Sequence, residues 1–179
     1  MGAHWTEDVS RLQPVLVVTP YRADANLITE LLRGFASTIA TLYAQTPETA
    51  LAVAAARSPR LIFVDQAAPP GDGLAFVRKL RRSDLPCREA PVIMMTSQPT
   101  LRAMRDAQNA GAHEFLVRPF SAQHLAKRLE VVIAPRPWIE TASYVGPDRR
   151  RFNSAALLGP DRRRGAGRHP RAEKASSAA

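Results

Sequence analysis

The chain has 179 residues, 45% of them hydrophobic, and a formal net charge of +9, which predicts one globular domain with additional chain. Its single cysteine, Cys87, excludes an internal disulfide and a metal site built from several cysteines. Because no stretch approaches the roughly 20 apolar residues of a membrane span and residues 1–13 lack the apolar core of a secretion signal, a cytoplasmic protein is expected.

Five apolar runs alternate along the chain with five segments of helical pattern. The runs are continuous rather than alternating, which is typical of strands buried on both faces of a parallel sheet. The predicted strands are Val15–Val18, Thr38–Leu42, Leu61–Val64, Val92–Met95 and Phe115–Val117. The predicted helices are Asp24–Arg33, Glu48–Ala56, Gly73–Arg82, Thr100–Ala110 and Ala122–Ile133.

Capping residues mark several of the predicted helix ends. Gly34 is expected to end the first helix and Gly111 the fourth, whereas Thr46 and Ser121 are expected to cap the second and the fifth. Five strand–helix alternations predict an α/β fold, namely a doubly wound, five-stranded parallel sheet between layers of helices.

The composition divides the chain into three parts. Residues 1–13 are predicted to be a flexible N-terminus, and residues 14–134 form the predicted domain. Residues 135–179 hold ten Arg or Lys and four acidic residues, and are predicted to be a basic, largely disordered tail. Within this tail, Gly146-Pro-Asp-Arg-Arg-Arg151 recurs as Gly159-Pro-Asp-Arg-Arg-Arg164.

A carboxylate, a hydroxyl and a cation each follow a predicted strand. Asp65, Thr96 and Arg118 stand at these places, and the carboxyl ends of parallel strands are where an open α/β sheet handles ligands. A strand-end aspartate often only caps a loop, and a threonine or arginine there is common. Asp65-x-x-x-Pro69-x-x-Asp72-Gly73 adds a defined turn into the next helix, which favours a functional interpretation.

The spacing of these residues resembles that of the receiver domains of two-component response regulators, over roughly residues 14–134. Gly111–Pro119, Pro135–Ile139 and Tyr144–Arg151 resemble a group of stand-alone bacterial receivers that carry a Gly-Pro-Asp/Glu-Arg-Arg tail and no DNA-binding output domain. The resemblance implies the flavodoxin-like receiver fold. It also implies a sensor histidine kinase or phosphotransfer protein as one partner, and a downstream protein as the target.

The same resemblance assigns roles to individual residues. It implies that Asp65 is the phosphoacceptor, that Thr96 and Phe115 occupy the two switch positions, and that Arg118 takes the place of a family lysine. In the family, the switch hydroxyl moves toward the phosphate and the aromatic ring turns inward. The fourth helix, the fifth strand and the fifth helix would form the docking face. The bond between Arg118 and Pro119 is a candidate cis peptide.

Two departures from the family pattern predict a degenerate receiver. Thr19 and Pro20 stand where the family has paired acids that hold Mg²⁺, which leaves Asp65 as a poor metal ligand and implies weak Mg²⁺ binding at most. Arg118 is expected to hold Asp65 in a standing ion pair through its two-nitrogen fork. Asp24 could restore some of the missing negative charge, but it is expected rather to cap the first helix. Phosphorylation is therefore predicted to be weak or absent, while the switch fold is retained.

The tail and the remaining motifs leave two further functions open. A phosphorylation-independent scaffold or phosphorelay sink is one alternative. The other is a protein that binds nucleic acid or an anionic surface through two basic clusters of the tail. These clusters could equally belong to a solvated tail without a binding role. The clusters are Arg149, Arg150, Arg151, Arg162, Arg163 and Arg164. Catalysis on a separate substrate is not expected, because His113 and His124 have no triad partners and no glycine-rich phosphate loop follows the first strand.

Overall fold

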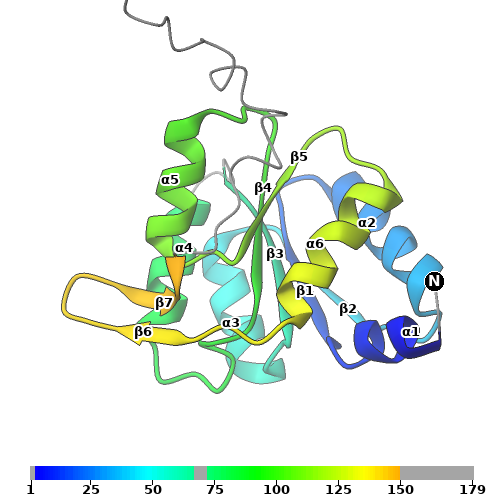
Figure 1. The fold of residues 1–179 in the computed structure, drawn as a ribbon, viewed down its shortest axis with the longest axis horizontal. Coiled ribbons are helices and arrows are strands. Elements are labelled where there is room, and N and C mark those ends of the chain that lie inside the picture. Colours follow the sequence, from blue (N-terminus) through cyan, green and yellow to red (C-terminus); the bar gives the residue numbers. More distant parts are fainter. Residues whose placement is uncertain (1–2, 67–71, 150–179) are drawn as a thin grey trace, which may run out of the picture.

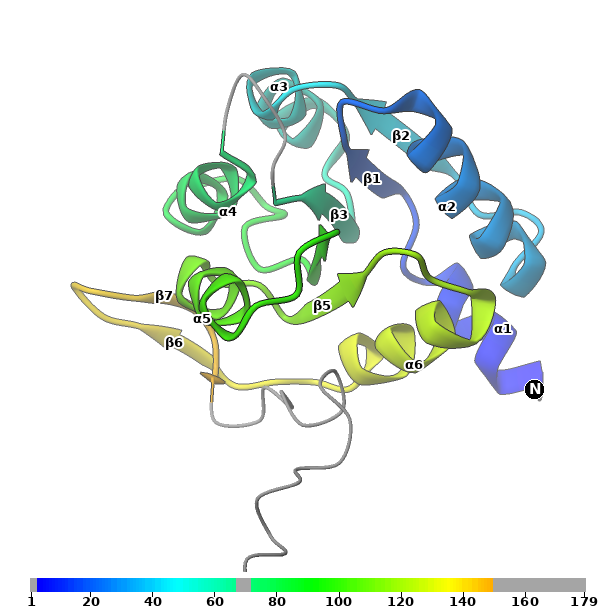
Figure 2. The same cartoon turned by 90° about the horizontal axis from the view of Figure 1, so that it is seen from above.

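Five parallel strands form the central sheet in the order β2-β1-β3-β4-β5, seen edge-on in Figure 2. The computed structural model describes residues 3–66 and 72–149. The strands are β1 (Val15–Val18), β2 (Thr41–Ala44), β3 (Leu61–Asp65), β4 (Val92–Thr96) and β5 (Glu114–Val117). This parallel sheet confirms the predicted α/β class. Each inner strand is buried along its whole length, as its apolar run predicted.

Helices cover both faces of the sheet (Figure 1). They are α1 (Ala3–Ser10), α2 (Arg22–Phe35), α3 (Pro47–Arg57), α4 (Gly73–Arg81), α5 (Leu101–Ala110) and α6 (Ala122–Ile133). One core, which includes Ile28 of α2 and Leu125 of α6, lies on one face. The other core, which includes Ala50 of α3, Phe76 of α4 and Met104 of α5, lies on the opposite face. None of the helices in the described residues is long and apolar enough to cross a membrane.

Most helix ends follow their predicted caps. Thr46 and Ser121 form capping boxes at the starts of α3 and α6, and Gly111 ends α5 in the left-handed conformation with a φ of 100°. Gly34 was expected to end α2, and this is wrong: the helix continues to Phe35, whose ring is buried and lies edge-on to Trp5 with centroids 6.2 Å apart. Burial of Phe35 thus extends α2 beyond its glycine.

The predicted second strand, Thr38–Leu42, lies about three residues too early. Ala36 to Ala40 form the connection, in which Ile39 is buried, and β2 pairs with β1 from Thr41 onward. Because β2 is an edge strand, its first three residues are only partly buried. Continuous burial, which locates the inner strands, is therefore a poor guide to an edge strand.

The N-terminus is a packed helix, so the expectation of a flexible segment over residues 1–13 is wrong for the described residues. Val9 and Leu12 are buried, and Trp5 packs against the same core. These three side chains are spaced as on one face of a helix. Helix α1 contacts both α2 and α6, and so closes one end of the layer that these two helices form (Figure 2).

Residues 135–149 are also ordered, which corrects the prediction of a largely disordered tail for this part. Strands β6 (Trp138–Glu140) and β7 (Val145–Pro147) form an antiparallel hairpin, the C-terminal hairpin, which lies beside α4 and α5 (Figures 1 and 2). Gly146 comes so close to the α5–β5 connection that a Cβ on it would lie 3.0 Å from the Cα of Gly111. Residues 150–179 lie outside the described residues.

The hairpin covers a buried arginine of α4. Arg81 is 1% exposed. Its guanidinium donates to the carbonyl oxygens of Gly111 (3.0 Å), Ala90 (2.9 Å) and Arg88. It also contacts Nδ1 of His113 at 3.2 Å and lies 5.3 Å from the ring centre of Trp138 in β6. Burial lowers the pKa of Arg81 to about 9, so the side chain remains a cation at neutral pH.

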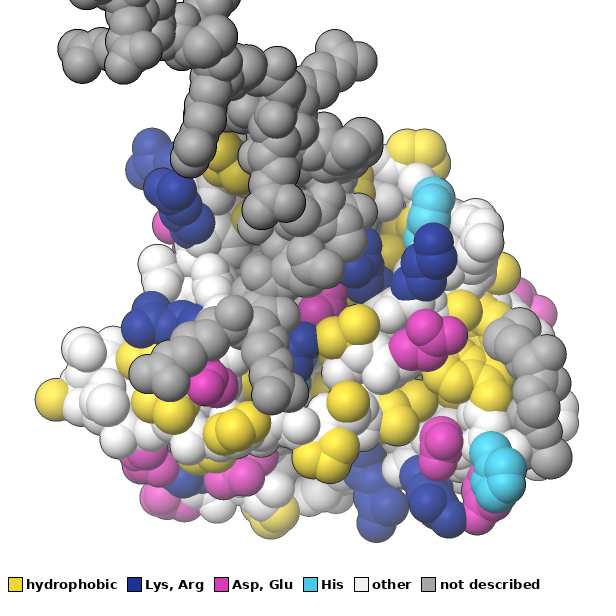
Figure 3. Space-filling view, viewed as in Figure 1, with side chains coloured by type: hydrophobic (Ala, Val, Ile, Leu, Met, Phe, Trp, Pro, Cys, Tyr) yellow, Lys and Arg dark blue, Asp and Glu magenta, His cyan; other side chains and the backbone are white. Residues whose placement is uncertain are grey.

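A second buried cluster joins the segment after α6 to the edge strand β5. The carboxylate of Glu114 is bonded to Arg136 at 3.0 Å and to Arg128 of α6 at 3.4 Å. Burial raises the pKa of Glu114, and the two arginines oppose this shift. Burial, together with Arg81 and Arg136, lowers the pKa of the neighbouring His113 well below its ordinary value. On the face of the molecule seen in Figure 1, Figure 3 shows hydrophobic, acidic and basic side chains interspersed over the described surface.

Candidate functional site

Three strands bring the predicted residues together at one edge of the sheet. Asp65 is the last residue of β3, Thr96 is the last residue of β4, and Arg118 directly follows β5. Their backbones are in register, because Asp65 pairs with Met95, Thr96 pairs with Val117, and the amide of Arg118 donates to the carbonyl of Thr96 at 2.8 Å. All three side chains line a pocket of about 300 Å³, so the predicted convergence is confirmed.

Arg118 and Asp65 form the expected ion pair. Nη2 of Arg118 lies 2.9 Å from Oδ2 of Asp65, whose side chain is 5% exposed. The same nitrogen lies 2.8 Å from Oδ2 of Asp24. Arg118 therefore bridges two carboxylates instead of gripping Asp65 alone with its fork. The three side chains together carry a formal charge of −1.

Asp24 is the site residue whose role the sequence misassigned. It was expected to cap the first helix, but the N-cap of α2 is Tyr21, and Asp24 lies in the first turn. From there its carboxylate reaches Arg118 across the edge of the sheet. In the sequence, Asp24 stands out only as an acidic residue five positions after Thr19. Acidic residues are common in the first turn of a helix because they stabilise the helix dipole, so this position did not indicate a contact with Arg118.

The positions after β1 contribute no carboxylate. Thr19 is fully buried, its amide donates to Ala44, and its hydroxyl oxygen accepts from the amide of Tyr21 at 3.3 Å. Pro20 has neither charge nor side-chain oxygen. Within residues 3–66 and 72–149, no group of three or more His, Cys, Asp or Glu is arranged to hold a metal ion. Since Mg²⁺ needs an oxygen shell supplied partly by carboxylates, and Arg118 already bonds both nearby carboxylates, these residues do not fit Mg²⁺.

The two predicted switch residues are both in the interior. Thr96 is 7% exposed and its hydroxyl oxygen accepts from the amide of Gln98 at 3.1 Å. Phe115 is completely buried in the core beneath α4 and α5.

The peptide bond between Arg118 and Pro119 is cis, as predicted. Gln66, which the sequence analysis did not single out, lines the same pocket and donates to the carbonyl of Ala103 at 3.3 Å.

A close backbone contact places the start of α4 beside Asp65. Asp72 caps α4 through a 2.8 Å bond from the amide of Leu74. Gly73 follows, and a Cβ on it would lie only 2.1 Å from the carbonyl oxygen of Asp65. Glycine is therefore required where the helix approaches β3. Pro69, the other residue of this predicted turn, lies outside the described residues.

Gly73→Ala is expected to lower the free energy of unfolding by about 2 kcal/mol or more, because a methyl group would push α4 away from the backbone of Asp65. Gly34→Ala is the matched control. No heavy atom lies within 4 Å of a Cβ at Gly34 in α2, so the alanine there should raise stability by up to about 1 kcal/mol. Urea unfolding followed by circular dichroism measures both. Equal effects of the two substitutions would contradict the contact.

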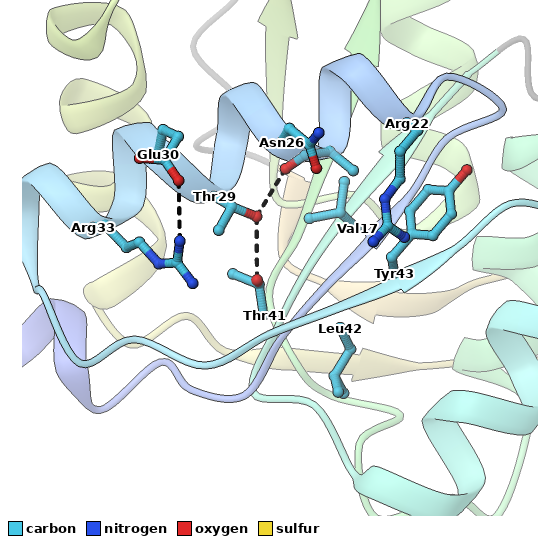
Figure 4. Close-up of a pocket in the computed structure, with 10 residues that line it drawn as sticks. Val17, Arg22, Asn26, Thr29, Glu30, Arg33, Thr41, Leu42 and Tyr43 are labelled. Atoms are coloured by element: carbon cyan, nitrogen blue, oxygen red, sulfur yellow. Dashed lines mark hydrogen bonds and ion pairs between the residues drawn. The ribbon is translucent and has the colours of Figure 1, made fainter.

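A larger groove of about 690 Å³ lies between α2 and β2, away from Asp65. Figure 4 shows that several of its polar side chains are paired with one another. Thr29 bonds Thr41 at 3.1 Å, and Arg33 bonds Glu30 at 3.0 Å. The guanidinium of Arg22 lies 4.5 Å from the ring centre of Tyr43. Because these groups satisfy each other, we place the functional site at the smaller pocket around Asp65.

The basic clusters of the tail are only partly described. Arg149 belongs to the fold: its Nη1 donates to Oδ1 of Asn109 at 2.7 Å, and it stacks 4.2 Å from the ring centre of Tyr144. The other five arginines of the two clusters, at 150, 151 and 162–164, lie outside the described residues. Binding of nucleic acid or an anionic surface through them stays a prediction.

Residues 15–130 match the family described as the response regulator receiver domain. KdpE, the KDP operon transcriptional regulatory protein of Escherichia coli (strain K12), is 32% identical over 119 residues, which are 66% of this chain and 50% of KdpE. The chain spans about half the length of the curated relatives that it matches.

Solved structures resemble the same part of the chain. The chemotaxis protein CheY4 of Vibrio cholerae superposes with a TM-score of 0.60 at 24% identity, over 66% of this chain and 96% of CheY4. The receiver domain of the sensor histidine kinase PA1611 of Pseudomonas aeruginosa PAO1 has a TM-score of 0.59 at 22% identity, over 66% and 95%, and was solved with a magnesium ion coordinated in its active-site cleft.

The family match covers well over half of the chain, and it coincides with the parallel sheet whose carboxyl edge carries Asp65, Thr96 and Arg118. The fold of CheY4 agrees with this assignment. This chain therefore belongs to the response regulator receiver domain family.

Proposed function

We propose that this protein is a receiver module of two-component signal transduction that acts through protein contacts and does not turn over a substrate of its own. In this proposal Asp65 occupies the phosphoacceptor position. A sensor histidine kinase or phosphotransfer protein is the upstream partner, and another protein is the target. The observation that carries the proposal is the convergence of Asp65, Thr96 and Arg118 on one pocket of a receiver fold.

We further propose that phosphorylation of Asp65 is impaired. Its carboxylate is already bonded to Arg118, and the positions after β1 supply no acid that would help hold Mg²⁺. Without a metal ion, the negative charge of the entering phosphoryl group would have to be neutralised by Arg118 alone. Phe115 is already buried, so turning its ring inward on phosphorylation could not bury the ring any further. A phosphorylation-independent module is the limiting case of this proposal.

The test is intact-mass spectrometry of the full chain after incubation with acetyl phosphate and Mg²⁺. We expect at most a small and slowly formed fraction of protein heavier by one phosphoryl group, and we expect Asp65→Asn to remove that fraction. Asp72→Asn is the matched control, since Asp72 caps α4 close by and should leave the fraction unchanged. Rapid, complete labelling abolished by Asp65→Asn would keep the phosphoacceptor role and contradict the impairment. Labelling that survives Asp65→Asn would contradict the phosphoacceptor role of Asp65.

The docking face implied by the family consists of α5, β5 and α6. In this chain the residues after β7 pack against part of it, because Gln108 of α5 donates to the carbonyl of Arg149 at 2.7 Å. The chain after α6 also crosses the start of β5 through Arg136, which donates to the carbonyl of His113 at 3.0 Å. A protein partner that uses this face would therefore contact the C-terminal hairpin as well as the receiver helices.

A further inference from the structure

We infer that Arg118 is the resident cation of the site: its Nη2 lies between Asp24 and Asp65 where a divalent metal ion would have to bind. Removing the guanidinium should therefore create a Mg²⁺ site that the native protein lacks. This inference rests on the proposed function and deepens it by naming the ion that occupies the site. It is tested by metal binding, so its failure can be told apart from the failure of the phosphorylation proposal.

The geometry of the bridge carries the inference. One nitrogen atom lies 2.8 Å from Oδ2 of Asp24 and 2.9 Å from Oδ2 of Asp65, so the two oxygens are at most about 6 Å apart and face the same point. A Mg²⁺ ion between them would need to lie about 2.1 Å from each oxygen. Mg²⁺ cannot bind between these oxygens while a guanidinium nitrogen occupies the same space, because the two groups would overlap and both are positively charged.

The bridge is fixed from three different elements. Asp65 ends β3, Asp24 lies in the first turn of α2, and the backbone of Arg118 is tied to β4 through the 2.8 Å bond to the carbonyl of Thr96. The side chain of Arg118 is 18% exposed and that of Asp24 is 26% exposed. Solvent therefore reaches the bridge from the side of Asp24, whereas Asp65 is 5% exposed. The pocket of about 300 Å³ that Asp65 and Arg118 line leaves room for the water ligands that Mg²⁺ retains.

Neutralising Arg118 changes the charge balance of the site. The two carboxylates would then lose the cation that bridges them, and each would favour a positive ion that enters between them. Two carboxylates and several waters are a common Mg²⁺ ligand set in proteins. Native protein, by contrast, has its counter-charge covalently attached, so the state of the site should not depend on the Mg²⁺ concentration.

The experiment is calorimetric titration of Mg²⁺ into the full chain, repeated with Mn²⁺ and detected by paramagnetic line broadening in NMR spectra. Native protein, Arg118→Ala, Arg118→Gln and the double variant Asp24→Asn/Arg118→Ala are compared. Arg33→Ala is the matched control, since Arg33 also pairs with a carboxylate, that of Glu30, but at a distant surface position. Circular dichroism verifies that each variant is folded.

We expect both Arg118 variants to bind Mg²⁺ at least tenfold more tightly than native protein and Arg33→Ala. Adding Asp24→Asn to Arg118→Ala should remove most of this gain, and Mn²⁺ should broaden signals of residues near Asp65 only in the two single Arg118 variants. Mg²⁺ should leave the thermal midpoint of native protein unchanged. Tight binding by native protein would overturn the inference, as would no gain in the Arg118 variants or a gain that is indifferent to Asp24.

Discussion

Arg81→Ala is expected to lower the free energy of unfolding by about 4 kcal/mol. The guanidinium donates to three main-chain carbonyls, contacts His113 and lies over Trp138. Alanine would leave these buried acceptors without a donor and would remove the surface on which the C-terminal hairpin packs. Urea unfolding, followed by tryptophan fluorescence at neutral pH, measures the loss.

Arg82→Ala is the matched control for this prediction. Arg82 is the next residue and an exposed arginine, so its replacement should change the free energy of unfolding by no more than about 0.5 kcal/mol. Arg81→Lys separates charge from geometry, because an ammonium group cannot reach all of the acceptors of the planar guanidinium. If Arg81→Ala were as stable as Arg82→Ala, the buried arginine would not be what holds the hairpin.

A chain that ends at residue 134 is expected to be less stable than one that ends at residue 149 by about 3 kcal/mol or more. The shorter chain loses Arg136, which pairs with the buried carboxylate of Glu114, and Trp138, which covers Arg81. It also loses Tyr144, which is 5% exposed and donates from its hydroxyl to the carbonyl of Pro147 at 2.7 Å. Without Arg136 the buried carboxylate of Glu114 keeps only the longer, 3.4 Å contact to Arg128, and a buried charge that loses part of its compensation destabilises the fold.

The comparison is made by urea unfolding of the two truncated chains beside the full chain. Both truncations lack residues 150–179, so the difference between them reports only the segment that contains the hairpin. Equal unfolding midpoints would contradict an integral role for it. The result also determines how binding by the arginine-rich repeats should be tested, because a deletion from residue 135 would damage the domain as well as remove the tail.

The fold of the central domain was predictable because its strands are buried on both faces. Runs such as Leu61–Val64 and Val92–Met95 are unbroken apolar segments, and capping residues such as Thr46 and Ser121 mark the helices between them. The edge strand β2 was displaced by about three residues because partial exposure removes that continuity. Residues 3–13 and 135–149 were misjudged because short segments owe their order to the surface that they pack on.

The candidate site was predictable in its strand-end members and not in the bridge between them. Asp65, Thr96 and Arg118 follow apolar strands, and the topology of a parallel sheet brings such residues to one edge. Asp24 lies on a helix, where its direction depends on how α2 is rotated against the sheet, and that rotation is set by side chains such as Ile28 and Leu32 in the core. A first-turn acid carries no sequence mark of such a contact.

The sequence by itself determined the α/β fold, the family resemblance and the absence of an acid at the two positions directly after the first strand. Burial pattern and strand-end chemistry are local properties of the chain. The tertiary structure alone decided that Arg118 joins Asp65 to Asp24, and that the segment after α6 closes over Arg81. These contacts join residues far apart in the chain, and their directions follow from packing against a shared core, which no local pattern encodes.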